Sequence, residues 1–421
     1  MRPGIVAAVG HDVVRPMTDR QDRPAPLAAV LTVTFAGSLS GGVFWQAIFF
    51  LTAGHYRFSP ERNLVLAAVM GAVYAIAAAG AGILVRRFSA SSSRAVLMAA
   101  LSAWTIAAVL PLTARHSETV LWPAALLGAA ASAVTWPIVE SYLSAGRHGA
   151  EMRAAIGQFN VTWTPATALA LLLMPIVSQA GALAPLVLSA AGSAAAFAAT
   201  FALPAHPGVH EPEAAQAAVG PEYGFLMRAA SWLLPTAYVL CAVMSPLLPH
   251  RLASVSGGSS GGGVAGLWMV ARFATLLMMW RTGFWHGRWG TLAAGGGALA
   301  LGLAVILLAP SLVGLAAGLV IFGVGMGLTY YAAIYYSLAV GHAAVDAGGT
   351  FEALIGFGYF AGPLLGLSAQ AVATPAHATS VTVALAWLVA AAGSAGALRP
   401  YFAARRARAA RSSAPISRMP R

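Results

Sequence analysis

The chain has 421 residues, of which 59% are hydrophobic and only 9% are charged, and its mean hydropathy is +0.76. A soluble domain carries about a quarter charged residues, so this chain cannot cover a water-facing surface and its surroundings must be largely lipid. The formal net charge of +12 comes from arginines in short gaps between apolar runs and in the two tails, which argues against the basic face of a nucleic-acid-binding protein.

Residues 1–26 contain arginines and no apolar core of signal-peptide length, so we expect a cytoplasmic N-terminal tail followed by a retained helix. Runs of about 20 mostly apolar residues, long enough to span a bilayer, then recur with short polar breaks. They predict an all-α, polytopic membrane protein with about twelve transmembrane helices. The expected helices are 27–53, 63–85, 95–113, 119–144, 154–178, 181–203, 229–250, 263–281, 290–309, 312–338, 351–373 and 379–398. Very tight turns are expected at Pro310 and near Gly181.

Two polar breaks are longer than the others. Residues 204–228 contain four prolines and three glutamates, which hydrocarbon cannot accommodate, so we expect a cytoplasmic connector there. It divides an N-terminal six-helix bundle at 27–203 from a C-terminal six-helix bundle at 229–398. The Ser- and Gly-rich run at 256–263 predicts a mobile loop between the seventh and eighth helices.

The arginines predict the orientation in the membrane. With the amino terminus inside, the opposite side holds only Arg57, Arg62, Arg115 and Arg251, whereas nearly all the others lie on the cytoplasmic side. The basic tail at 399–421 adds to that excess, which the positive-inside rule requires. We therefore expect a multi-pass protein of the cell inner membrane with both termini cytoplasmic.

A short internal repeat supports the division into two sets of six helices. Tyr142, Ala155–Gly157 and Pro165 recur about two hundred residues later as Tyr336, Leu354–Gly356 and Pro363. Each copy joins an even-numbered helix to the next odd one, as two parallel six-helix repeats would do.

Helix number, central connector, cytoplasmic tails and parallel repeat together resemble the major facilitator superfamily over residues 27–398. Gly82, Leu84 and Arg87 also match that family's Gly-x-Leu-x-Asp-Arg-x-Gly-Arg loop signature, with Arg86 at the aspartate position and Ser89 at the later glycine. The resemblance implies alternating access, in which two bundles rock about a central site, and makes Arg86 and Arg87 candidate gating residues.

Charged groups inside the spans are rare and therefore informative. Each costs about 2.5 to 3.5 kcal/mol in hydrocarbon on insertion scales, so it needs a partner or a function. Arg272, midway along the eighth helix, is a candidate anchor for an anionic or polar substrate group, or else an interhelical packing contact. Glu140 is a candidate coupling or gating carboxylate, or else pairs with Arg86, Arg87 or Arg153. Glu352 is a candidate gate residue, or a carboxylate stabilised by the first turn of its helix.

Uncharged polar and aromatic side chains complete the expected substrate site. Amide and hydroxyl groups need hydrogen-bond partners away from water, so they favour a wet cavity over lipid. The candidates are Gln46, Trp45, Asn160, Trp163, Tyr331 and Tyr335, with core filling or an interfacial belt as the alternative for the aromatic ones. Tyr331 and Tyr335, four residues apart, share one helix face.

The leading hypothesis is a secondary active transporter, a monomer that moves a small-molecule solute across the lipid bilayer, with protons as a candidate coupling ion. The chain contains no lysine, so it has no ATP-binding Gly-x-x-x-x-Gly-Lys loop. It shows no nucleophile elbow, because its Gly-x-Ser-x-Gly matches fall in the Ser- and Gly-rich run at 256–263, and it has no His-Glu-x-x-His motif. Its one cysteine, Cys241, offers no metal-ligand spacing. We therefore expect no catalytic residues, cofactors or metals. The alternative is a non-transporting membrane scaffold or an intramembrane enzyme with the same helices.

Overall fold

The computed structural model describes residues 24–87, 92–147, 149–208, 222–256, 262–340, 345–374 and 376–412. In that part of the chain, twelve helical spans are long and apolar enough to cross a bilayer, which confirms the predicted number and the all-α class. Helices suit this environment because hydrocarbon offers no partners to backbone N–H and C=O groups, so each span must satisfy its own.

The first span is built from α1 (Leu27–Gly42), a π-helical turn η1 (Val43–Ala47) and α2 (Ile48–Gly54). The next five are α3 (Pro60–Arg87), α4 (Ser93–Thr113), α5 (Glu118–Ser144), α6 (Gly149–Val177) with η2 (Ser178–Ala180), and α7 (Ala184–Ala199) with η3 (Thr200–Ala202). The last six are α8 (Tyr223–Ser256), α9 (Gly262–Ala265) with α10 (Leu267–Arg281), α11 (Trp289–Leu308), α12 (Leu312–Val340), α13 (Val345–Val372) and α14 (Ala378–Ser412).

Both expected tight turns are present. Only three residues around Pro310 separate the end of α11 at Leu308 from the start of α12 at Leu312. At the other turn, Gly181 has a φ of 143°, a conformation that glycine adopts freely and that side chains with a Cβ resist. The turn at Pro310 leads directly into the packing of α11 against α12, whereas α6 and α7 touch little and each packs along α1.

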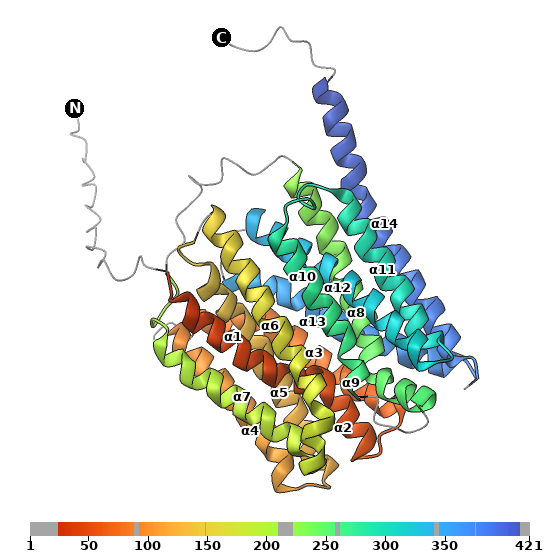
Figure 1. Ribbon diagram of the computed structural model, residues 1–421. Coiled ribbons are helices and arrows are strands. Elements are labelled where there is room, and N and C mark those ends of the chain that lie inside the picture. Colours follow the sequence, from red (N-terminus) through yellow and green to blue (C-terminus); the bar gives the residue numbers. More distant parts are fainter. Residues whose placement is uncertain are drawn as a thin grey trace, which may run out of the picture.

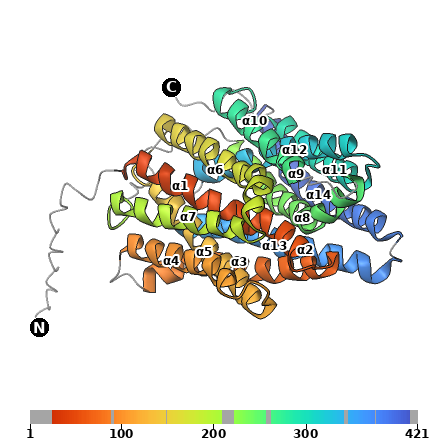
Figure 2. The ribbon, with the colours of Figure 1, turned by 60° about the horizontal axis from the view of Figure 1, so that its bottom comes forward.

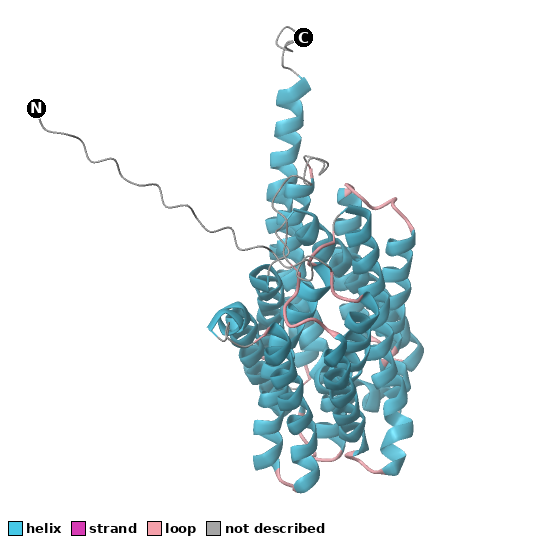
Figure 3. Ribbon diagram, turned by 90° about the vertical axis from the view of Figure 1, so that its left-hand side faces the viewer, coloured by secondary structure: helices cyan, strands magenta, loops and turns pink. Residues whose placement is uncertain are grey.

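The described chain begins and ends on one side of the bundle. Figure 1 shows the start of α1 and the end of α14 on the same side, which we call the terminal face, and we call the opposite side the far face. Figure 2 shows α1, α4 and α7 in one half of the bundle and α11, α12 and α14 in the other. In Figure 3, α14 extends beyond its neighbours on the terminal face.

The expected boundaries of tails, connector and bundles stay predictions. Residues 1–23, 209–221 and 413–421, which include most of both tails and the middle of the connector, lie outside the described residues. So do 88–91, in the signature loop, and 257–261, in the Gly-rich loop.

The two halves meet through glycines. A Cβ at Gly356 of α13 would lie 2.6 Å from the Cα of Ala75 on α3, and one at Gly366 would lie 2.8 Å from the side chain of Leu64. On the other side of the interface, Gly157 of α6 packs directly against the Trp280 side chain of α10. Gly157 and Gly356 are the corresponding glycines of the sequence repeat, so both repeats place a glycine where the halves approach closely.

Arg147 ties the first helix to the end of α5. Its buried guanidinium donates to the carbonyls of Tyr142 and Leu143 at 3.0 and 2.7 Å, and to the carbonyl of Ala25. Burial lowers the pKa of Arg147 from its usual value, and the nearby Glu151 carboxylate opposes that change. The side chain thus satisfies carbonyls at a helix end that have no helical partner.

We expect Arg147→Ala to lower the free energy of unfolding by about 2–3 kcal/mol, because it leaves buried carbonyl groups without a donor. Thermal denaturation of the detergent-purified protein measures this as a lower melting temperature. Arg115→Ala, at an exposed arginine on the far face, should change stability by less than about 0.5 kcal/mol. Equal melting temperatures for the two variants would contradict the proposed tie.

Candidate functional site

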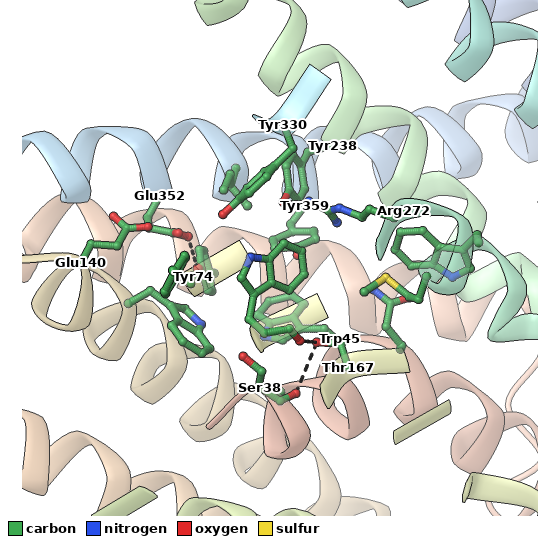
Figure 4. Close-up of a pocket in the computed structure, with 18 residues that line it drawn as sticks. Ser38, Trp45, Tyr74, Glu140, Thr167, Tyr238, Arg272, Tyr330, Glu352 and Tyr359 are labelled. Carbon is green, nitrogen blue, oxygen red and sulfur yellow. Dashed lines mark hydrogen bonds between the residues drawn. The ribbon is translucent and has the colours of Figure 1, made fainter. Parts of the chain in front are cut away.

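A polar cavity of about 100 Å³ lies between the two halves (Figure 4). Helices of both halves line it, so a movement of one half against the other must change its shape. Its lining residues are Ser38, Gly41, Trp45, Gln46, Tyr74, Trp136, Glu140, Phe159, Trp163, Thr167, Tyr238, Trp268, Met269, Arg272, Tyr330, Glu352, Ile355 and Tyr359. A larger hollow of about 500 Å³ between α8, α11 and α14 is lined mainly by Ala, Gly and Leu and by no charged residue, so the central cavity is the candidate site.

Arg272 holds a positive charge against this cavity, midway along its span. Its side chain is only 3% exposed, and Nη2 donates to the Tyr238 hydroxyl at 3.1 Å. The guanidinium carbon lies 4.5 Å from the ring centre of Trp163 and 4.6 Å from that of Tyr330, within cation–π range. No described carboxylate forms an ion pair with Arg272, and its Nε has no hydrogen-bond partner among the described residues.

Two buried carboxyl groups, one from each half, meet at another part of the cavity. Glu140 of α5 and Glu352 of α13 lie within hydrogen-bonding reach of each other, and the Tyr74 hydroxyl donates to Glu352. Figure 4 shows the two acids side by side. Carboxylates only accept hydrogen bonds, so a hydrogen bond between the two requires a proton on one of them. The arrangement can therefore hold a proton between the halves.

Among the described residues, Glu140 does not pair with an arginine, which was the alternative to a coupling role. Within the described chain Glu140 forms no ion pair with Arg86, Arg87 or Arg153. Its ionisable neighbour is another acid, Glu352. Arg86 and Arg87 are exposed at the end of α3, on the terminal face. A gating role for these two arginines stays a prediction.

The π-helical turn η1 turns two predicted residues toward the cavity. Trp45 stacks on Tyr359 with ring centres 4.4 Å apart and donates from Nε1 to Ser132 at 3.2 Å. The Gln46 side-chain oxygen accepts from the Ser245 hydroxyl of α8 at 3.2 Å, a hydrogen bond between the halves. Insertions of this kind inside helices occur often at functional sites, because they change the direction in which side chains point.

Three predicted substrate residues lie outside the cavity lining. Asn160 is fully buried, and its side-chain oxygen accepts from Trp163 Nε1 at 2.9 Å. It therefore supports a residue that lines the cavity without lining the cavity itself. Tyr331 and Tyr335 pack on Trp285, with ring centres 5.3 and 4.9 Å away, in an aromatic cluster outside the lining. Their direct contact with a solute stays a prediction.

Four tyrosines that line the cavity are not among the residues expected from the sequence, namely Tyr74, Tyr238, Tyr330 and Tyr359. A tyrosine deep within an apolar span is itself a signal, since its hydroxyl needs a partner there. Tyr330 directly precedes Tyr331, which the sequence favoured because Tyr331 and Tyr335 share one helix face. The cavity uses the adjacent residue, about 100° away around the helix.

The described residues contain no group of three or more His, Cys, Asp or Glu side chains able to hold a metal ion. No family model matches the chain, and no curated protein matches it significantly.

Solved structures do match the fold. The chain is similar to the human organic anion transporter MFSD10, with a TM-score of 0.60 and 17% identity over 90% of this chain and 99% of that one. It is also similar to the nucleoside transporter NupG, with a TM-score of 0.58 and 13% identity over 89% and 98% of the two chains. A structure from proton-dependent oligopeptide transporters gives a TM-score of 0.64 with 12% identity over 89% and 97%. The protein thus has the fold of the major facilitator superfamily transporters, as its sequence suggested.

Proposed function

We propose that this multi-pass membrane protein is a secondary active transporter that carries a small organic solute by alternating access, coupled to protons. One observation carries the proposal: both halves of a transporter fold line a central cavity that contains a buried arginine and a buried pair of carboxyl groups. Buried charges are costly in a membrane protein and cluster where ions and substrates pass.

The size of the cavity supports a cycle of conformations. Ligand pockets usually measure about 300 to 1,000 Å³, and the cavity here holds about 100 Å³. The halves touch on both sides of it, through Gly157 and Trp280 toward the terminal face and through Gly366 and Leu64 toward the far face. A solute therefore enters when the halves separate on one side and leaves when they separate on the other.

The acid pair supports proton coupling. A single proton shared by Glu140 and Glu352 holds the halves together by a hydrogen bond, whereas two ionised carboxylates at that distance repel each other. Loss of the proton thus favours separation at this point. The proton and the solute share one cavity, so each changes the free energy of the other's binding.

For the setting, we propose the cell inner membrane, a monomer, and a cytoplasmic terminal face. The arginine excess supports this orientation, because arginines at helix ends favour the cytoplasmic side. The names of the structural neighbours include organic anions, nucleosides and oligopeptides as cargo. Since this single fold serves such different solutes, the cavity residues and not the fold must decide the substrate.

A two-step experiment tests the proposal. A thermal-shift screen on the detergent-purified chain identifies solutes that stabilise it, because a ligand that binds the folded state raises its apparent stability. Proteoliposomes preloaded with each hit then report counterflow of the radiolabelled compound. We expect counterflow that depends on the protein. Stabilising ligands that never exchange, or a ligand released chemically changed, would instead favour the scaffold or the intramembrane enzyme.

A further inference from the structure

The charged groups of the cavity are unequally satisfied. Figure 4 shows the two acids on one side and Arg272 on the other. Glu352 lies beside Glu140 and accepts a hydrogen bond from Tyr74, so the acids have neighbours within the protein that can satisfy them. Among the described residues, one partner accepts from Arg272, the Tyr238 hydroxyl, although a guanidinium carries five N–H donors. The faces of aromatic rings offset only part of the free energy that a cation loses when it is removed from water.

We propose that the transported solute is a compact organic monoanion whose carboxylate binds Arg272. This inference rests on the proposed transport function and adds the substrate class to it. A carboxylate can accept two parallel N–H bonds from the planar guanidinium, the geometry that makes such pairs strong. It would also give a buried charge the ionic partner that the described residues do not provide.

The rest of the cavity limits what else the solute can carry. A single arginine neutralises a single negative charge, and a second anionic group would have to lie near Glu140 and Glu352. An amine has less to gain, because those two carboxyl groups lie close enough to share a proton with each other. The wall beside Arg272 is aromatic, with Trp163 and Tyr330 against its guanidinium. A flat, apolar body attached to the carboxylate therefore fits both the surface and the small volume.

The test compares compounds of one shape and different charge on the intact protein. The probes are benzoate, neutral benzamide, cationic benzylamine, zwitterionic 4-(aminomethyl)benzoate and dianionic terephthalate. Thermal shift measures binding, and proteoliposomes measure counterflow of radiolabelled benzoate. We expect benzoate to stabilise the protein and to exchange, while the other four compete with it at least about tenfold more weakly, as expected when a charged hydrogen bond is lost or a charge is left unpaired.

Variants connect the preference to the proposed residue. Arg272→Gln should weaken benzoate binding roughly 10- to 150-fold, and Arg272→Lys, which keeps the charge without the planar fork, should fall between it and the wild type. The matched control is Arg251→Gln. Arg251 is a half-buried arginine outside the cavity, where it donates to the Ala309 carbonyl at 2.9 Å. This variant should bind benzoate as the wild type does. Elution from a size-exclusion column shows whether each variant is folded.

The possible failures are distinguishable. Exchange of only neutral, cationic, zwitterionic or dianionic probes would overturn the monoanion proposal and leave transport standing. Unchanged benzoate binding in folded Arg272→Gln would overturn the role of Arg272. Absence of exchange for every probe and every hit of the wider screen would count against transport itself. If Arg272→Gln does not fold, the five-compound series on the wild-type protein still decides the charge preference.

Discussion

Replacing Glu352 by glutamine should abolish proton-driven accumulation while solute exchange continues. Glutamine has the shape of the protonated acid and can still hydrogen-bond with Glu140 and Tyr74, but it cannot take up or release a proton. The half-cycle that carries solute alone needs no change of protonation. Energy from a proton gradient, by contrast, can reach the solute only through a group that binds protons on one side and releases them on the other.

Two assays on the same proteoliposomes separate these effects. Under an inward proton gradient, uptake by Glu352→Gln should fall to the level of protein-free liposomes, while counterflow at equal pH on both sides stays within a few-fold of the wild type. Glu140→Gln should have the same effect, because in the proposed mechanism the two acids share one proton. Glu61→Gln is the matched control, since Glu61 is exposed at the far-face end of α3. Full accumulation by both cavity variants would show that the pair only holds the halves together.

The number of spans and their helical class could be predicted from the sequence, because polar side chains and unpaired backbone groups are costly at every position in hydrocarbon. Long apolar runs have no other stable conformation in lipid than a helix, so composition alone identifies them. Turn chemistry is equally local, and for that reason the turns at Pro310 and Gly181 appear where the sequence placed them. The bounds of the tails and the connector are harder to predict from the sequence, because no comparable constraint acts on the polar segments outside the membrane.

The cavity could be predicted only in part, for a reason that lies in the helices themselves. Buried charges such as Arg272 and Glu352 stand out because lipid penalises them wherever they face. By contrast, the sequence of a uniformly apolar helix does not show which of its faces points toward the other half. The choice between Tyr330 and Tyr331 depends on which side of α12 faces the other half, and α12 is apolar all round. The meeting of Glu140 and Glu352 likewise depends on how α5 packs beside α13, which no local pattern records.

Adding a side chain at Gly356 or Gly157 should hold the terminal face open and slow transport. A Cβ at Gly356 would lie 2.6 Å from the Cα and 2.8 Å from the amide nitrogen of Ala75, which cannot move aside unless α3 and α13 separate. At Gly157 it would collide with the ring of Trp280. Overpacking of this kind costs about 1–3 kcal/mol. If this destabilisation affects only the conformation that is closed at the terminal face, the population of that conformation falls roughly 5- to 150-fold.

Cysteine labelling follows the change directly. The chain has one cysteine, so Cys241→Ala provides the background, and Ser38→Cys provides a thiol in the cavity lining. In Gly356→Val, a membrane-impermeant maleimide should react with that thiol faster from the terminal face and more slowly from the far face, while counterflow falls. Gly157→Val should give the same result, because its contact with the Trp280 side chain also joins the two halves.

The control for these variants is Gly297→Val on α11. A Cβ there would meet no atom within 4 Å, so the same change of residue in a helix interior adds no contact between the halves. It should leave labelling from both faces and counterflow close to wild type. Should Gly356→Val label and transport as Gly297→Val does, α3 and α13 would have to remain packed at this point through the whole cycle. The opening movement would then pivot about the α3–α13 contact, and closure would depend on other contacts between the halves, such as Gly157 against Trp280.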